Sequence, residues 1–107
     1  MKKRNIVDLK FGGDAMYVVL MYDIMMDKDG AKVQRNTFKI CKRYLTHIQK
    51  SVFEGNLTEL NLMKLKKELG QYIRDHKDSL VIFKSRDEKW LAKEFLGLKD
   101  DKTSNFF

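Results

Sequence analysis

The sequence predicts a single α+β domain in which strands and helices alternate along the chain. The first sign is the run MYVVLMYD at residues 16–23, where seven consecutive apolar residues end on a carboxylate. Its β-branched and aromatic residues favour a strand that is covered on both faces. The second sign is a helical apolar period at 31–46 and again after residue 58, with short apolar runs between and after. A chain of 107 residues with 43% apolar residues is expected to form one core.

The elements after the first strand follow in order. Residues 24–30 are rich in turn formers and predict a loop. A helix is expected at 31–46, where apolar residues recur with the helical period: Val33, Ile40, Cys41, Tyr44 and Leu45. Residues 47–55 predict two short strands that meet at a tight turn near residues 50–51, and Gly55 is expected to end the second strand.

A second helix and a last strand complete the predicted sheet. Thr58 is a candidate N-cap, and Leu57 is expected to pack on Leu62 one turn later. This helix is expected to end near residues 74–76, and a nearly continuous apolar strand follows at 78–84. The order strand, helix, strand, strand, helix, strand predicts a ferredoxin-like (βαββαβ) sandwich with both helices on one face of the sheet.

The six predicted elements leave one segment of sequence at each end of the chain. Residues 1–15 show no clear period and predict an N-terminal extension outside the core, with an edge strand at 5–11 as the alternative. Residues 88–97 add apolar side chains after the sheet is complete, which favours an extra C-terminal strand exchanged with a second copy and hence a homodimer. The domain is therefore predicted to span 16–97, and 98–107 is predicted to be a flexible tail.

Composition narrows the classes of partner. The net charge of +7 is spread along the chain, which favours polyanions, with nucleic acid ahead of an acidic membrane surface. No segment is long and apolar enough to predict a membrane span, and no secretory leader is apparent. The single cysteine, Cys41, excludes an internal disulfide and predicts a small buried residue. A cytoplasmic location is the simplest expectation.

Basic residues form one arc of the predicted helix 31–46. At 100° per residue they fall within about 100° of each other: Lys32, Arg35, Lys39, Lys42 and Arg43. No acidic residue occurs from residue 31 to residue 53, so the arc has no carboxylate beside it in the sequence. We expect this arc, with Lys50 in the turn that follows, to contact nucleic-acid phosphates; a merely solvated basic face is the alternative.

Five segments of the sequence match one known family in order. They are MYVVLMYDI at 16–24, HIQKSVFEGNLT at 47–58, KLKKE at 64–68, DSLVIF at 78–83 and EFLG at 94–97. The run QKSVFEG at 49–55 is the most specific of them. With these segments, which span 16–97, the chain resembles the small universal CRISPR-associated adaptation protein family, whose members are partners of the CRISPR integrase.

The resemblance implies a ferredoxin-like homodimer that bridges integrase dimers and holds double-stranded DNA destined to become a new spacer. It also implies a magnesium-dependent endonuclease activity on RNA or double-stranded DNA. In that family the acid at the end of the first strand is the catalytic and metal-binding residue, which corresponds to Asp23 here. The serine and phenylalanine of the second motif, Ser51 and Phe53, are expected near it.

The residues themselves leave the enzymatic interpretation open. Mg²⁺ takes oxygen ligands and keeps several waters, so one or two carboxylates can hold it. One Asp23 per chain is a minimal set, and two copies across a dimer twofold would form a fuller site. The segment 25–36 resembles a calcium loop only at Asp27 and Asp29, because Met25 and Asn36 occupy its first and twelfth positions.

Two other proteins of the same fold remain as alternatives. One is the virulence-associated ribonuclease toxin, and the other is a non-catalytic RNA-binding module. A module of the second kind is expected to display exposed aromatic residues on its middle strands. The apolar residues of the segment 47–55 do not form such a platform: Ile48, Val52 and Phe53.

Overall fold

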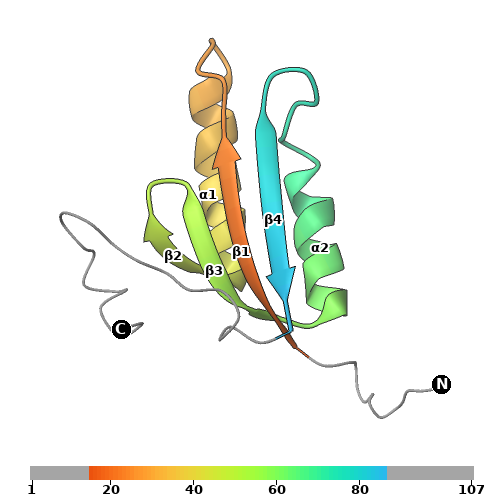
Figure 1. Cartoon of the computed structure of the whole chain (residues 1–107). Helices are drawn as coiled ribbons and strands as arrows, with labels where there is room; N and C mark the ends of the chain where they lie inside the picture. Colours follow the sequence, from red (N-terminus) through yellow and green to blue (C-terminus); the bar gives the residue numbers. More distant parts are fainter. Residues whose placement is uncertain (1–14, 87–107) are drawn as a thin grey trace.

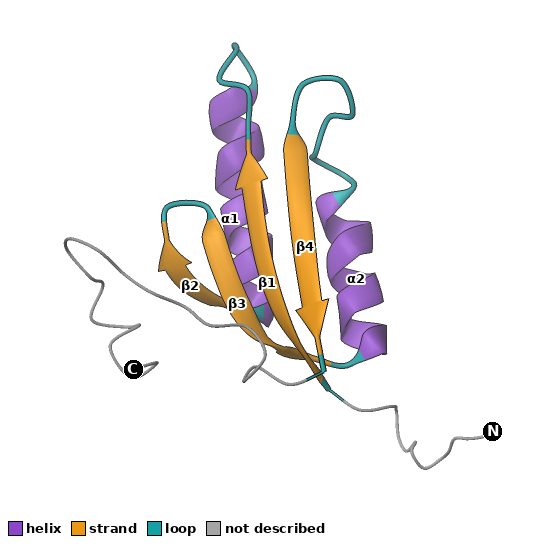
Figure 2. Cartoon of the chain, viewed as in Figure 1, coloured by secondary structure: helices purple, strands orange, loops and turns teal. Residues whose placement is uncertain are grey.

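The computed structural model describes residues 15–86, which form a two-layer sandwich (Figure 1). Four strands, β1 (Met16–Asp23), β2 (Thr46–Gln49), β3 (Val52–Leu57) and β4 (Ser79–Ser85), form a sheet in the order β2-β3-β1-β4, with all neighbours antiparallel. Two helices, α1 (Gly30–Tyr44) and α2 (Glu59–Leu69), cover one face of this sheet (Figure 2). The predicted ferredoxin-like α+β fold is confirmed. The predicted N-terminal extension, exchanged C-terminal strand and tail fall on residues that lie outside the described range, apart from Ala15.

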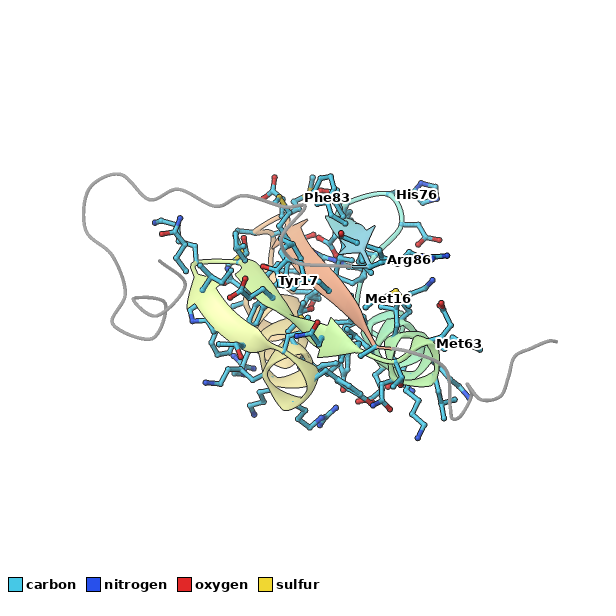
Figure 3. The ribbon with its side chains drawn as sticks, turned by 60° about the horizontal axis from the view of Figure 1, so that its bottom comes forward. Met16, Tyr17, Met63, His76, Phe83 and Arg86 are labelled. Atoms are coloured by element: carbon cyan, nitrogen blue, oxygen red, sulfur yellow. The ribbon has the colours of Figure 1, made fainter. Side chains whose placement is uncertain are left out.

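The two faces of the sheet differ in how well they are covered. Residues that alternate along β1 toward the helices are buried in one core with Phe53 and the apolar side of both helices: Val18, Leu20 and Tyr22. On the opposite face, Met21, Val81 and Phe83 are 37%, 45% and 50% exposed. Met21 pairs with Val81 in the register of β1 and β4, and Phe83 lies on the side away from the helices (Figure 3). The expectation that both faces of the first strand are covered is therefore wrong at Met21.

The turn between β2 and β3 forms where the sequence predicts it. Lys50 has φ = 43°, in the left-handed region that such tight reversals require. The expected strand end at Gly55 is wrong, because β3 continues to Leu57. A Cβ at position 55 would lie 3.0 Å from Cδ2 of Leu45, so this glycine lets the end of α1 approach the strand.

The second helix begins as predicted and ends early. Thr58 is its N-cap, and the backbone N–H of Asn61 donates to Thr58 Oγ1 at 3.1 Å. The helix ends at Leu69 rather than near 74–76, and residues 70–77 form turns and irregular backbone. Tyr72 and Ile73 continue the apolar pattern because they still pack against the core from those turns. Within residues 15–86, no helix has the length and apolar character needed to cross a membrane.

Candidate functional site

Asp23 lies at the end of β1, where its carboxylate is exposed. It pairs in register with Ser79, the first residue of β4, so the two strand ends open a shallow cavity of about 380 Å³. The loop between α2 and β4 lines the rest of this cavity, with charged or titratable side chains at four consecutive positions: Asp75, His76, Lys77 and Asp78. Asp23 is thus in the position predicted for it, beside a polar loop that the sequence alone did not place there.

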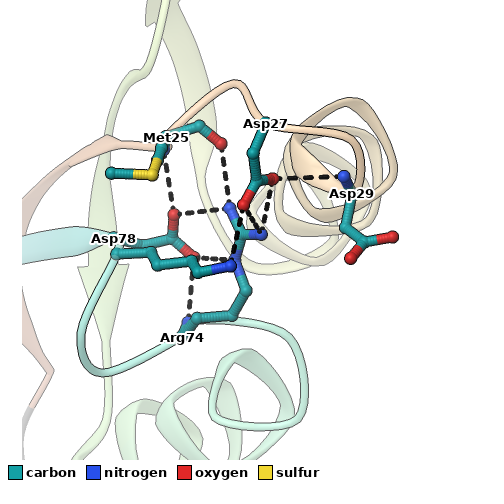
Figure 4. Close-up of polar contacts among 6 residues, drawn as sticks. Met25, Asp27, Asp29, Arg74 and Asp78 are labelled. Atoms are coloured by element: carbon teal, nitrogen blue, oxygen red, sulfur yellow. Dashed lines mark hydrogen bonds and ion pairs between the residues drawn. The ribbon is translucent and has the colours of Figure 1, made fainter.

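An arginine-centred ion-pair cluster joins the loop between β1 and α1 to the loop between α2 and β4 (Figure 4). The Arg74 guanidinium donates to Asp27 Oδ1 at 2.8 Å and Oδ2 at 3.0 Å, and to the Met25 carbonyl at 2.8 Å. It also donates to both carboxylate oxygens of Asp78, at 2.9 and 3.0 Å. Lys77 Nζ adds a contact to Asp27 at 2.9 Å. Both aspartates are therefore engaged in structural ion pairs.

These contacts lower the pKa of both carboxyl groups. The hydrogen bond from Arg74 lowers the pKa of Asp78 to about 2, although burial of its side chain opposes the shift. Hydrogen bonds from Arg74 and then Lys77 hold the pKa of Asp27 well below its usual value. The same pairs raise the pKa of Arg74, so the cluster is fully ionised at neutral pH. Asp78 also accepts from the Met25 N–H at 2.9 Å, which fixes the backbone two residues after Asp23.

One chain by itself provides a small set of metal ligands. Among residues 15–86 there is no cluster of three His, Cys, Asp or Glu side chains that could surround an ion. Asp78 lies beside Asp23 in the cavity, but its oxygens accept from Arg74 and Met25. Among the described residues, the cavity carboxylates outside the Arg74 cluster are therefore Asp23 and Asp75, and they fit Mg²⁺ only with waters, substrate oxygens or a second copy.

Ser51 and Phe53 lie on the β3 side of β1, whereas this cavity lies on the β4 side. The backbone N–H of Tyr22 donates to the Ser51 carbonyl at 3.2 Å, which ties the β2–β3 turn to the residue before Asp23. Phe53 is fully buried, and its ring stacks on Tyr22 with centroids 6.1 Å apart. Neither residue lines the cavity beside Asp23. Ser51 lines a second and larger cavity, and Phe53 supports the core beneath it.

This second cavity, called the α1 groove below, lies between α1 and the β2–β3 turn and measures about 960 Å³. Three of the six predicted nucleic-acid contacts line it: Arg35, Lys39 and Lys50. The other lining residues are uncharged: Tyr22, Ala31, Gln34, Phe38 and Ser51. All three cations are exposed, and none of them forms an ion pair with another residue of the described range. The α1 groove therefore has a positive rim.

The remaining three predicted contacts lie outside the groove. Lys32 and Lys42 are exposed on α1, again without an ion pair to any residue between 15 and 86. Arg43 differs, because its guanidinium pairs with Glu68 of α2. The Tyr44 hydroxyl donates to the same carboxylate and, with Arg43, lowers the pKa of Glu68. The basic arc has no carboxylate beside it in the sequence, but in the fold Arg43 meets an acid that lies 25 residues away.

Sequence reasoning missed two residues that organise these sites. The sequence pattern puts Arg74 at the expected end of the second helix, and only its proximity to Asp27, 47 residues away, reveals its role. Phe38 was not assigned to the apolar face of the first helix. On a helical wheel it lies about 40° from Lys42, at the edge of the basic arc, and the signal that could have found it is an aromatic residue between Arg35 and Lys39 in the sequence.

The antiparallel β2-β3-β1-β4 sheet with two helices on one face defines a ferredoxin-like protein. Solved structures agree: one described as a crystal structure of Cas2 has a TM-score of 0.70 at 26% identity, covering 81% of this chain and 92% of its own. The Cas2 structure from Streptococcus pyogenes has a TM-score of 0.67 at 30% identity, covering 77% of this chain and all of its own.

Sequence comparison identifies the family. The family model described as CRISPR associated protein Cas2 matches residues 16–93, and the chain belongs to this family. A relative named CRISPR-associated endoribonuclease Cas2, from Fusobacterium nucleatum subsp. nucleatum, is 59% identical over 97% of this chain and 98% of its own. A second relative whose name includes the same activity, from Moorella thermoacetica, is 40% identical over 83% of this chain and 99% of its own. The resemblance noted in the sequence is confirmed, which favours it over the toxin and the RNA-binding module.

Proposed function

We propose that this protein acts in CRISPR adaptation (spacer acquisition) as a dimeric scaffold that binds double-stranded DNA for the CRISPR integrase. The observation that carries the proposal is the positive surface of α1 and the β2–β3 turn. Its exposed cations Arg35, Lys39 and Lys50 pair with no acid of the described range, so their charge is available to phosphates. Membership of the Cas2 family supports the CRISPR context.

The exposed sheet face supports dimerisation. Met21, Val81 and Phe83 present apolar side chains on the face of β1 and β4 that the helices leave open. A second copy that packs there would bury them by an isologous contact. Sedimentation of the purified protein tests this: a dimer is expected, and Phe83→Glu is expected to shift it toward the monomer.

The duplex-binding proposal is tested by reversing charge on α1. In the variant with Arg35, Lys39 and Lys42 changed to Glu, sequence-independent duplex binding and its steep salt dependence are expected to be lost. The matched control reverses three exposed lysines of α2, Lys64, Lys66 and Lys67, and is expected to retain most of the affinity. If the α1 variant kept the wild-type affinity and salt slope, the assignment of this surface would be wrong. Co-purification and spacer integration with the integrase test the adaptation role.

A second candidate function is a magnesium-dependent endonuclease, and it is favoured by the relatives' name, endoribonuclease. Two Asp23 carboxylates brought together across a dimer twofold would hold Mg²⁺, which would supply charge stabilisation at a phosphodiester. The chain's own contribution is to fix Asp23 at the end of β1, since Asp78 and Arg74 hold the loop that follows it.

The nuclease candidate is tested with Asp23→Asn and, as a matched control, Asp75→Asn in the same cavity. The Asp23 variant is expected to lose Mg²⁺-dependent cleavage of RNA or double-stranded DNA and to lose Mg²⁺ binding by calorimetry, whereas the Asp75 variant keeps both. Cleavage at the wild-type rate by the Asp23 variant would refute the catalytic role. Spacer integration that survives in that variant would show that the scaffold does not need the nuclease.

A further inference from the structure

The α1 groove has a chemical character that a duplex-binding surface does not need. Its rim holds three cations, whereas its floor contains the aromatic residues Tyr22 and Phe38. Duplex phosphates contact exposed cations on any convex or flat surface, because the bases stay stacked inside the helix. A concave site with an aromatic floor is instead suited to a base that has left the stack.

The aromatic floor is held in place from below. The Phe38 ring meets His47 edge-on with centroids 4.9 Å apart and Phe53 with centroids 5.4 Å apart. Phe38 remains half-buried, so part of its ring faces the groove. A ring fixed in this way offers a stacking surface without a large loss of side-chain freedom on binding.

The β2–β3 turn, which carries Lys50 opposite α1, is also held in place. His47 Nε2 lies 2.7 Å from the Lys50 carbonyl oxygen, and the Tyr22 N–H donates to the Ser51 carbonyl at 3.2 Å. These two contacts anchor the β2–β3 turn at both of its central residues. Lys50 is therefore presented across the groove from Arg35 and Lys39, and among residues 15–86 no acidic residue lines the space between them.

We infer that the α1 groove binds an unpaired nucleotide of a nucleic-acid strand, with its base against Phe38 and its phosphates held by Arg35, Lys39 and Lys50. The volume of about 960 Å³ is at the upper end of the range for small-ligand sites, which leaves room for a base, its sugar and the flanking phosphates. This inference rests on the proposed nucleic-acid function and adds what part of the strand the protein recognises. Such a nucleotide occurs at the frayed end of a DNA duplex or in single-stranded RNA.

The test compares a blunt DNA duplex, the same duplex with unpaired ends, and single-stranded RNA, by fluorescence anisotropy. The wild-type protein is expected to bind one or both unpaired probes more tightly than the blunt duplex. The probe with the higher affinity shows whether the nucleotide comes from a duplex end or from single-stranded RNA. Phe38→Leu keeps the apolar volume but removes the π-face, so it is expected to weaken unpaired probes about tenfold and leave the blunt duplex unchanged. Tyr72→Leu, a half-buried aromatic outside the groove, serves as the control and is expected to change neither.

A second measurement needs no substitution. Photocrosslinking with 5-iodouracil at the unpaired position is expected to modify Phe38, in the peptide 36–39 that trypsin releases between Arg35 and Lys39. An adduct confined to another aromatic residue, such as Phe83, would overturn the inference. Equal binding of blunt and unpaired probes by the wild type would also overturn it and leave the duplex scaffold intact. If the wild type bound none of the probes, the proposed nucleic-acid-binding function itself would be refuted.

Discussion

Two groups of charged residues in this small domain differ in what their charges contact. In the cluster around Arg74, two carboxylates and a backbone carbonyl accept hydrogen bonds from one guanidinium at 2.8–3.0 Å, and the Lys77 ammonium donates to one of the same carboxylates at 2.9 Å. In the α1 groove, Arg35, Lys39 and Lys50 have no ion-pair partner among residues 15–86. The first group joins two loops of the fold, and the second is left for an external anion.

The comparison shows that net charge is a poor guide to function until each charge is assigned a partner. Arg74 and Lys77 contribute to the excess of +7 as much as Lys39 does. Their charges, however, are paired with carboxylates inside the fold. The Asp78 side chain is fully buried, and the Asp27 side chain is only 26% exposed. Removing a cation should therefore destabilise the protein in the first group and weaken anion binding in the second. Four predictions examine that division.

The largest effect is expected from Arg74→Met. Because this change leaves the buried Asp78 carboxylate without its cation, the melting temperature is expected to fall by about 10 °C, measured by circular dichroism. Duplex affinity, measured where the variant is still folded, is expected to stay near the wild-type value. Lys77→Met, which removes the half-exposed cation of the same cluster, should lower the melting temperature by only about 2 °C. Equal losses in the two variants would contradict the central role of Arg74.

The next largest effect concerns acid stability. Because folding lowers the pKa of Asp78 from 3.8 to about 2, its stabilising contribution is complete above the unfolded value and is lost as pH falls through the folded one. Asp27 acts in the same direction. The melting temperature of the wild type is thus expected to drop between about pH 4 and about pH 2. Asp78→Asn should melt lower at neutral pH and lose less over that window. Parallel pH curves would show that the cluster is not the titrating element.

Much of the fold can be predicted from the sequence because its signals are local. The apolar run of β1, the Thr58 cap and the left-handed turn at Lys50 depend on residues within a few positions of each other. The end of α2 could not be predicted in this way. Tyr72 and Ile73 continue the helical apolar period, but they pack on the core from turns, and the backbone N–H of Arg74 donates to Asp78 at 2.9 Å.

The candidate site was predicted in part for the same reason. The basic arc follows from helical geometry, and all of its members do lie on α1. Which of them are free follows from tertiary contacts: Arg43 meets Glu68 across the two helices, whereas Lys50 joins Arg35 and Lys39 across the groove. No period in the sequence records such contacts. The exposure of Asp23 could be inferred from its place at a strand end, but its neighbours on the α2–β4 loop could not.

A smaller effect is expected at Lys50. Lys50→Asn removes the charge while keeping a residue that tolerates φ = 43°, so the melting temperature is expected to change little. The logarithmic salt dependence of duplex binding should become shallower by about 0.9, the value for one phosphate contact. Lys28→Asn changes an exposed lysine that does not line the groove and is expected to leave the slope unchanged. An unchanged slope in the Lys50 variant would remove this residue from the binding surface.

The smallest effect tests a residue that lies between the two groups. Arg43 is on the basic arc but is paired with Glu68, and its side chain is still 59% exposed. Glu68→Gln keeps an acceptor for the Tyr44 hydroxyl and removes the charge that holds Arg43, so the melting temperature should fall by less than about 3 °C. Glu59→Gln is the control with the same charge change on the same helix. If Arg43 then joins the unpaired cations, duplex affinity should rise about twofold relative to that control, with a steeper salt slope. Equal affinity in both variants would instead show that Arg43 does not contact the duplex even after its ion pair with Glu68 is removed.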